Sequence, residues 1–213
     1  MKEVFVTNVG SHMWGMNHPG SDVDLFVAYA VPSSDILRGI AKTDSQHVQR
    51  ETVVGGVPVK EDLAIHEIGK VVDMVLDGNV NFLWGVFSPL VVRDTEGYLR
   101  GLKDIALRNL SQRCYGSIHG LGIHNYKKYI ESGKDPSEKR CNIIARTAQF
   151  GINLLLRGVP EFRGIIGTKP EQIPEFLRLL DEAKAHSILP ENAQYASEMR
   201  DWLLKTRNSY FED

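Results

Sequence analysis

Gly10-Ser11, followed ten residues later by Ser21-Asp22-Val23-Asp24-Leu25-Phe26-Val27, is the stretch that decides the fold of this chain. The β-branched and aromatic residues of the second segment predict a β-strand. Side chains alternate between the two faces of a strand, so Asp22 and Asp24 project to the same face. Both carboxylates lie where the strand begins, and there they can share a divalent cation.

A glycine-rich turn precedes this strand, and Ser11 in it is a plausible N-cap for a short helix through about Asn17. Gly10-Ser11 can offer backbone N–H groups to phosphate oxygens, and Gly15, Pro19 and Gly20 allow the segment to fold back onto the strand. An acid pair beside a phosphate-binding turn indicates metal-assisted chemistry on a nucleoside triphosphate. The competing interpretation is a solvated strand end, because Asp-x-Asp is a common tripeptide.

Length and composition limit the classes of protein to consider. The chain has 213 residues, enough for one large domain or two small ones, and 42% hydrophobic with 24% charged residues indicates a globular protein. A membrane helix needs roughly 18–20 apolar residues in a row. The most apolar window, residues 82–92, is interrupted by Gly85, Ser88 and Pro89. The N-terminus resembles a strand rather than a signal peptide, so we expect a cytoplasmic protein without a membrane partner.

Charge is distributed unevenly along the chain. Residues 112–160 contain 8 basic and 3 acidic side chains, whereas residues 1–111 contain 10 basic and 14 acidic ones. A basic block between acidic flanks has two interpretations, a solvated helix face or a positive wall that faces an anionic ligand.

The pattern of residues changes from strand to helix near residue 67. Residues 45–54 and 57–66 flank Gly55-Gly56 and predict a β-hairpin. An apolar stripe at helical spacing follows from Glu67, and the rest of the chain after residue 90 reads as entirely helical, with the last helix expected to start at about Leu189-Pro190. The predicted fold is therefore α+β, with a small mixed β-sheet domain over residues 1–92 and an all-helical domain over residues 93–213.

A third acid is needed for a site that binds two metal ions, because carboxylates must bridge both cations. Asp62 lies in the second arm of the hairpin, which can neighbour the strand of Asp22 and Asp24. The adjacent Glu61 points to the opposite face. Ala64 and His66 share the face of Asp62 and leave room there.

These motifs resemble the signature of the DNA polymerase β-like nucleotidyltransferases. More narrowly, the segments at residues 62–70 and 77–84 are similar to the RNA-ligase-associated predicted nucleotidyltransferase family. The chain departs from that family's pattern at Val80, where a Pro is usual, and at Trp84-Gly85, where a Glu is common. The resemblance covers residues 5–90 well and residues 139–158 loosely.

The resemblance implies a metal-dependent nucleotidyltransferase with two Mg²⁺ or Mn²⁺ ions. Asp22, Asp24 and Asp62 would be both catalytic residues and metal ligands, with Asp62 favouring deprotonation of the incoming hydroxyl. Hard carboxylate and phosphate oxygens suit these cations. The implied nucleotide-binding residues are Gly10, Ser11, Ser21, Lys139 and Arg146.

Lys139 and Arg146 are seven residues apart, so they lie on nearly the same face of a helix. The resemblance implies that they neutralise triphosphate charge, and the competing interpretation is a solvent-facing basic stripe. Four residues of the preceding helix could reach a nucleotide, but we expect a structural role for each: Tyr115, Ser117, His119 and His124. His12 and His18 flank the Gly10-Ser11 turn, and proximity in the sequence is the only argument for them.

Three functions remain open from the sequence. The leading hypothesis is transfer of a nucleoside monophosphate from an NTP to a hydroxyl acceptor with release of pyrophosphate, the acceptor being an RNA or DNA end among other candidates. The alternatives are a nucleotide-binding regulatory module without turnover, and an antitoxin-like or aminoglycoside-type enzyme that modifies a protein or a small molecule. The sequence leaves the base preference and the oligomeric state open.

Overall fold

A mixed five-stranded sheet forms the first part of the protein, and the computed structural model describes residues 1–41, 43–54 and 56–211. The strand order is β3-β4-β2-β1-β5. Short helices α1 and α2 lie in the connections between the first strands. The bounds of the strands and of these helices are β1 Lys2–Asn8, α1 Gly10–Met13, β2 Val23–Ala30, α2 Ser33–Leu37, β3 Gln46–Val54, β4 Val57–Glu67 and β5 Val91–Arg93.

Helices make up most of the remaining chain. Two of them follow β4 directly, and the others follow β5. Their bounds are α3 Ile68–Leu76, α4 Val80–Phe87, α5 Tyr98–Arg108, α6 Arg113–Asn125, α7 Glu138–Arg157, α8 Ile173–Ala185 and α9 Ala196–Tyr210, with a π-helix at Tyr126–Glu131 and a 3₁₀-helix at Pro170–Gln172. Among the described residues, none of these helices has the length and apolar character required to span a membrane.

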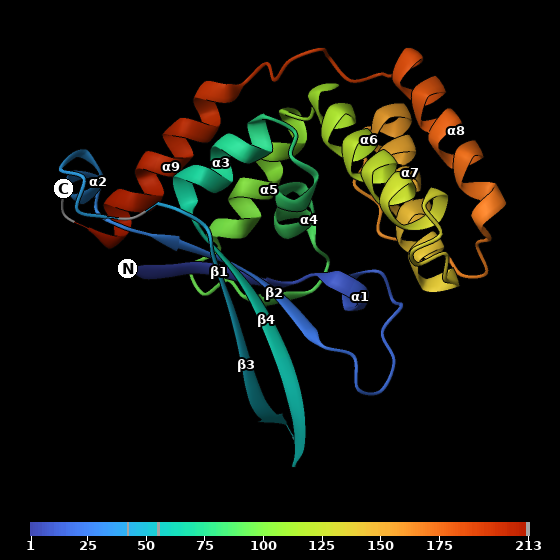
Figure 1. Ribbon diagram of the computed structural model, residues 1–213. Coiled ribbons are helices and arrows are strands. Elements are labelled where there is room, and N and C mark those ends of the chain that lie inside the picture. Colours follow the sequence, from blue (N-terminus) through green and yellow to red (C-terminus); the bar gives the residue numbers. More distant parts are fainter. Residues whose placement is uncertain (42, 55, 212–213) are drawn as a thin grey trace.

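The two central strands, β2 and β4, run parallel, and their register places Asp24 opposite Asp62. Paired positions in parallel strands project to the same face, so Phe26 and Ala64 follow these acids on one face. Val23 and Glu61 pair on the other face. The hairpin of β3 and β4 extends past the start of β2, as Figure 1 shows.

The larger helices lie on one side of the sheet (Figure 1), with α3, α4, α5 and α9 above the strands and α6, α7 and α8 beyond α4. Helix α7 packs against α6 and α8, and α9 packs against α3 and α5. The C-terminal helix therefore returns to the region of the first strands, although nearly 200 residues of sequence separate it from β1.

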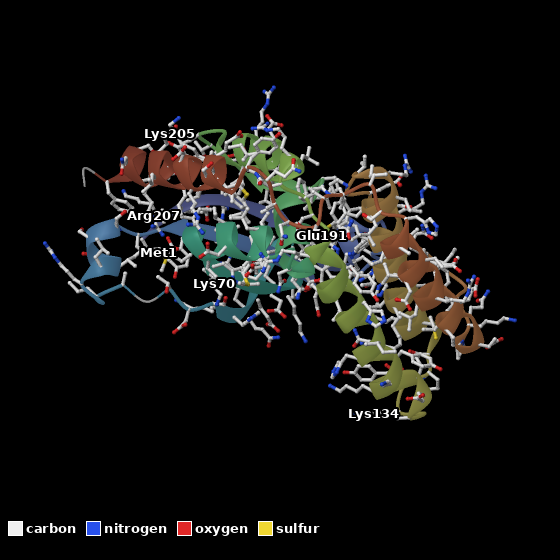
Figure 2. The ribbon with its side chains drawn as sticks, turned by 90° about the horizontal axis from the view of Figure 1, so that it is seen from above. Met1, Lys70, Lys134, Glu191, Lys205 and Arg207 are labelled. Atoms are coloured by element: carbon white, nitrogen blue, oxygen red, sulfur yellow. The ribbon has the colours of Figure 1, made fainter. Side chains whose placement is uncertain are left out.

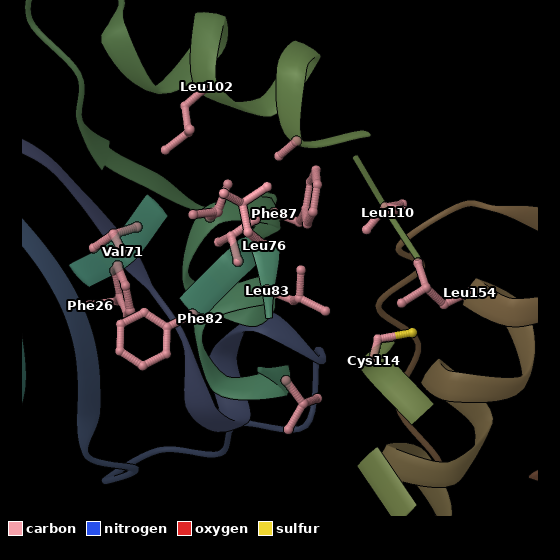
Figure 3. Packing of buried hydrophobic residues seen from close by; sticks show 14 of the residues in the cluster. Phe26, Val71, Leu76, Phe82, Leu83, Phe87, Leu102, Leu110, Cys114 and Leu154 are labelled. Atoms are coloured by element: carbon pink, nitrogen blue, oxygen red, sulfur yellow. The ribbon is translucent and has the colours of Figure 1, made fainter. Parts of the chain in front are cut away.

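The main hydrophobic core lies between the sheet and these helices (Figure 3). The ring of Phe26 on β2 packs edge-to-face against Phe82 on α4, with centroids 5.7 Å apart. Helix α4 approaches β2 closely at Gly85, where an added Cβ atom would lie 2.4 Å from the Phe26 ring. The carbonyl of Gly85 also accepts a hydrogen bond of 2.7 Å from Oγ1 of Thr7 on β1. These contacts fix α4 over the sheet.

A buried ion pair joins the last helix to the end of β4. Nη2 of Arg207 on α9 lies 2.6 Å from Oε1 of Glu67, and their side chains are only 11% and 2% exposed. The other Glu67 oxygen accepts a 2.6 Å hydrogen bond from the Gly69 backbone N–H and so caps α3. Figure 2 labels Arg207 along α9, beside the strands. The pair fixes the position of α9 relative to the strand that carries Asp62.

The sequence-based prediction of an α+β fold, with a mixed sheet followed by mostly helical structure, is confirmed. The hairpin was predicted correctly, although Gly55 of its turn lies outside the described residues. The strand β5 (Val91–Arg93) was not predicted, because three residues give no periodicity and only their antiparallel pairing with β1 makes them a strand. The region after residue 90 is therefore not entirely helical.

Candidate active site

The Gly10 backbone lies directly against the Asp24 carboxylate. A Cβ atom added at Gly10 would lie 1.7 Å from Oδ2 of Asp24, and Gly10 has a φ of +62°, where side chains are strained. The backbone N–H of Val9, the residue before Gly10, donates a 2.7 Å hydrogen bond to the Asp24 carbonyl. Only glycine therefore allows the start of α1 to meet the start of β2 in this way.

The carboxyl group of Asp24 has a shifted pKa. Burial raises the pKa of its carboxyl, and the neighbouring carboxylates of Asp62 and Asp22 raise this pKa further. His12 and Arg146 act in the opposite direction on the same pKa. The carboxylates of Asp22 and Asp62 thus lie near that of Asp24. The basic side chains of His12 from α1 and Arg146 from α7 face them.

The donor set fits a hard divalent cation, since it consists of carboxylate oxygens beside a backbone cradle that a single Cβ would fill. Within the described part of the chain, no three His, Cys, Asp or Glu side chains are close enough together to hold a metal ion. Asp62 Oδ2 instead accepts a long hydrogen bond of 3.4 Å from Gln49 Nε2 on β3. Mutual repulsion of like charges opposes a closer approach of the acids.

A cavity of about 650 Å³, which we call the carboxylate pocket, opens beside the acids. It contains all five residues that the sequence predicted for nucleotide binding, together with two of the three acids. Asp62 lines a neighbouring cavity of about 440 Å³ with Gln49 and Arg50, and Asp22 borders both. The predicted residues in the carboxylate pocket are Gly10, Ser11, Ser21, Asp22, Asp24, Lys139 and Arg146.

The two basic residues from α7 differ in their surroundings. Lys139 is exposed at the rim of the carboxylate pocket. Arg146 is half-buried, its guanidinium carbon lies 5.1 Å from the centre of the Trp14 ring, and burial lowers its pKa to about 10 while Asp24 opposes that shift. Arg146 therefore stays positively charged near neutral pH, and its Nε atom has no hydrogen-bond partner among the described residues.

Ser21 stabilises the loop at the edge of the carboxylate pocket. Its Oγ accepts a 2.9 Å hydrogen bond from the His18 backbone N–H, and its own N–H donates to the His18 carbonyl at 2.9 Å. These bonds close the loop between α1 and β2. The Ser21 side chain therefore holds the loop that carries the pocket wall.

The structure adds residues that the sequence did not predict for the site. His12 on α1 faces the Asp24 charge, and its Nε2 atom is buried without a hydrogen-bond partner in the described part of the chain. Met16 and Asn142 line the carboxylate pocket. Proximity to Gly10-Ser11 was the only sequence signal for His12, and Asn142 carried none except its place between Lys139 and Arg146.

Residues of α6 that were weighed for nucleotide contact serve the helical packing. Ser117 Oγ accepts a 2.9 Å hydrogen bond from the Val80 N–H at the start of α4. Tyr115 donates through its hydroxyl to Asp181 on α8 at 2.8 Å, and His119 lies 3.6 Å from the same carboxylate. Their partners are structural, as the sequence led us to expect.

Comparison with known proteins places these features in context. A protein-family model described as "RNA repair pathway DNA polymerase beta family" (RlaP) matches residues 1–152. No curated protein matched the sequence. Among solved structures, a nucleotidyltransferase-like protein from Exiguobacterium sibiricum is 11% identical, and the match covers 86% of this chain and 69% of that chain with a TM-score of 0.33.

Proposed function

The chain belongs to the RNA repair pathway DNA polymerase beta family, and we propose that it transfers a nucleoside monophosphate from a nucleoside triphosphate to a hydroxyl acceptor. One observation carries this proposal. Asp24 and Asp62 stand opposite each other on parallel strands, and the Gly10 backbone lies against Asp24. This arrangement supports the proposal, because it brings two of the proposed metal-binding acids close to the proposed phosphate cradle.

In the proposed reaction the acceptor oxygen forms a bond to the α-phosphorus, and the bond from that phosphorus to the β-phosphate oxygen breaks. Pyrophosphate leaves, and the acceptor proton passes to the carboxylate of Asp62. Arg146, held against Trp14, offers positive charge to the phosphates, and Lys139 adds charge from the pocket rim. Ser11 and the Gly10 backbone orient the terminal phosphates.

Asp22, Asp24 and Asp62 are the residues that would hold the divalent cations of this reaction, Mg²⁺ or Mn²⁺. Bound there, two such ions supply charge neutralisation for the attacking and leaving oxygens. The unfavourable charge crowding at Asp24, visible in the direction of its pKa, supports this assignment because a cation would relieve it.

A nucleic-acid end is the acceptor we propose, and two features support it. The family description names an RNA repair pathway. In addition, the structure gathers cations around the Tyr129 ring, with the Arg140 guanidinium 3.9 Å and Lys128 Nζ 5.1 Å from its centre. Basic groups around an aromatic ring suit single-stranded nucleic acid. Figure 2 shows the nearby Lys134 at the tip of the helical half.

The decisive experiment uses α-labelled NTPs, Mg²⁺ and separate acceptors: short RNA, short DNA, an aminoglycoside and a mixture of proteins. We expect label on the RNA or DNA end, release of pyrophosphate, and no label when EDTA replaces Mg²⁺. An Asp24→Asn variant serves as the matched control and should not transfer label. Nucleotide binding without transfer to any acceptor would point to a regulatory module, and label on the aminoglycoside or a protein would point to a different acceptor class.

A further inference from the structure

A second cavity, which we call the aromatic cavity, lies beside the carboxylate pocket and has a volume of about 520 Å³. Its walls include the rings of Trp14, Phe26, Phe82 and Trp84. It shares only Gly10 and Arg146 with the carboxylate pocket. Its volume falls in the range of pockets that enclose small organic ligands, which is about 300–1,000 Å³.

Polar groups in this cavity lack partners or are held neutral. The indole Nε1 of Trp84 and Nε of Arg146 are buried, and neither has a hydrogen-bond partner in the described part of the chain. Burial lowers the pKa of His66 to about 4, so its ring is neutral at physiological pH. Ser45 Oγ lies 2.7 Å from His66 Nδ1 and fixes the ring. Flat apolar walls with a few unpaired donors match a neutral heteroaromatic ring.

The position of the aromatic cavity relative to the acids indicates which substrate it takes. Ala64 and His66 line it, and they follow Asp62 on the same face of β4. The phosphate-facing residues Ser11 and Lys139 line the other pocket and not this one. Phe26, which pairs with Ala64 and follows Asp24 on β2, lines the aromatic cavity as well. The cavity therefore lies along the strands beyond both acids, and a molecule in it would approach them from a different direction than a triphosphate in the carboxylate pocket.

We propose that the aromatic cavity binds the terminal nucleoside of a single-stranded nucleic-acid acceptor, with its base among the rings and its hydroxyl directed to Asp62. The assignment rests on the proposed transfer reaction for the direction of the hydroxyl. Lys70 and Arg146 also line the cavity and provide positive charge for the first phosphodiester of the strand. Base stacking on aromatic side chains tolerates any sequence, so the proposal predicts weak base preference at the acceptor end.

Tryptophan fluorescence tests binding without any need for turnover. The chain has three tryptophans, of which Trp14 and Trp84 line the cavity and Trp202 lies on α9. A short single-stranded RNA, added without NTP or metal, should quench the fluorescence of the wild type and of a Trp202→Phe variant alike. An Ala64→Leu variant places a larger side chain in the cavity and should weaken this binding about tenfold or more.

An Ala196→Leu variant is the matched control, because Ala196 is also half-buried but lies at the start of α9, outside the cavity. It should bind the RNA like the wild type. An Asn81→Ala variant, at an exposed cavity residue, provides a second test in case Ala64→Leu folds poorly. Equal RNA affinity in the wild type, Ala64→Leu and Asn81→Ala would overturn the assignment.

A second measurement separates the acceptor from the base of the NTP. We expect Ala64→Leu to leave the dissociation constant of the NTP within about twofold of the wild type and to raise the KM for the RNA acceptor about tenfold. The opposite result, weakened NTP binding with an unchanged acceptor KM, would assign the cavity to the NTP base and overturn the proposal. If RNA binding depends on Ala64 but the wild type transfers no nucleotide, the cavity assignment stands and the proposed reaction fails.

Discussion

Strand β4 carries an acid at its middle, Asp62, and another at its end, Glu67, and the two acids have opposite surroundings. Glu67 is almost fully buried, and it is paired with Arg207 and hydrogen-bonded to the Gly69 N–H. Asp62, five residues earlier, is half-buried and faces the like charge of Asp24, and within the described part of the chain its carboxylate has only a long contact to Gln49. The charge of Glu67 has its partners within the chain, whereas we propose that a bound ligand neutralises the charge at Asp62 and Asp24.

The largest expected effect is on catalysis and follows from a change at Asp24. Asp24→Asn should lower kcat/KM for nucleotide transfer by about 1,000-fold or more, equivalent to about 4 kcal/mol, because a neutral amide binds a cation poorly. The same change removes a charge that is repelled by Asp62 and Asp22, so the melting temperature should not fall. Rate assays with labelled NTP and thermal unfolding by circular dichroism check both. An active Asp24→Asn enzyme would remove the distinction between the proposed catalytic acids and the structural acid Glu67.

Arg207→Ala should show the opposite behaviour, with a loss of stability instead of chemistry. It leaves the Glu67 carboxylate buried without its cation, which costs about 3–5 kcal/mol of unfolding free energy. Urea unfolding measures this loss. Arg178→Ala, in an exposed ion pair on α8, is the control and should cost less than about 1 kcal/mol.

The double variant Glu67→Gln/Arg207→Ala sharpens this prediction. It should recover part of the lost stability, because no uncompensated charge remains. If Arg207→Ala lowers the unfolding free energy no more than the control Arg178→Ala does, the buried Glu67 carboxylate does not depend on Arg207. The structural role that we assign to this ion pair would then be wrong.

His66 lies between Asp62 and Glu67 in the sequence of β4. Its shifted pKa leads to a prediction for how the stability of the protein depends on pH. Its pKa is lowered from 6.5 to about 4 in the folded protein by burial, with His47 and Lys70 adding to the shift. Between these values the unfolded chain binds a proton that the folded chain does not, so stability falls as pH falls through this window. The full loss from pH 6.5 to pH 4 is about 3 kcal/mol. Urea unfolding at several pH values should show this slope in the wild type and a reduced slope in His66→Gln.

The smallest effect is expected at the exposed rim of the carboxylate pocket. Lys139→Ala should raise the KM for NTP about tenfold, or about 1.4 kcal/mol, and the difference should shrink as salt concentration rises. Lys205→Ala, an exposed lysine on α9 that Figure 2 labels away from the pocket, is the control and should leave the KM unchanged. A salt-independent effect of Lys139→Ala would mean that the residue acts through structure instead of charge.

Local patterns in the sequence were sufficient for much of the fold. Alternation predicted the hairpin arms of β3 and β4, and the apolar stripe from Glu67 predicted α3. Helix ends were less accurate. Ser11 was a plausible cap for a helix through Asn17, but α1 is only Gly10–Met13 with Val9 as its N-cap, because Gly10 with positive φ already starts the turn.

The start of the last helix was also predicted too early, at Leu189-Pro190. These residues are held as coil, since the Leu189 carbonyl accepts from Gln112 Nε2 at 2.8 Å and the Pro190 carbonyl accepts from the Gln112 N–H at 2.8 Å. Helix α9 begins only at Ala196. These two hydrogen bonds from Gln112 join residues about 80 positions apart and override the local preference for a helix at Leu189-Pro190. No local sequence pattern reveals them.

The composition of the candidate site was more predictable than its surroundings. Acids at alternating positions and a Gly-Ser turn are visible in the sequence, because strand periodicity alone places their side chains. The aromatic cavity is not visible, since it forms only when Trp14, directly after α1, and Trp84 from α4 meet, with ring centroids 5.6 Å apart. The gathering of Arg140 and Lys134 around Tyr129 also depends on the turn between two helices.

Asp22, Asp24 and Asp62, we propose, bind divalent cations together with an NTP, and every catalytic prediction depends on this binding. Electron paramagnetic resonance of Mn²⁺ tests it directly, because bound Mn²⁺ loses the signal of the free ion. We predict that the protein binds Mn²⁺ in the presence of a non-hydrolysable NTP analogue, and that Asp24→Asn and Asp62→Asn both abolish this binding. Equal Mn²⁺ binding by the wild type and both variants would contradict the claim.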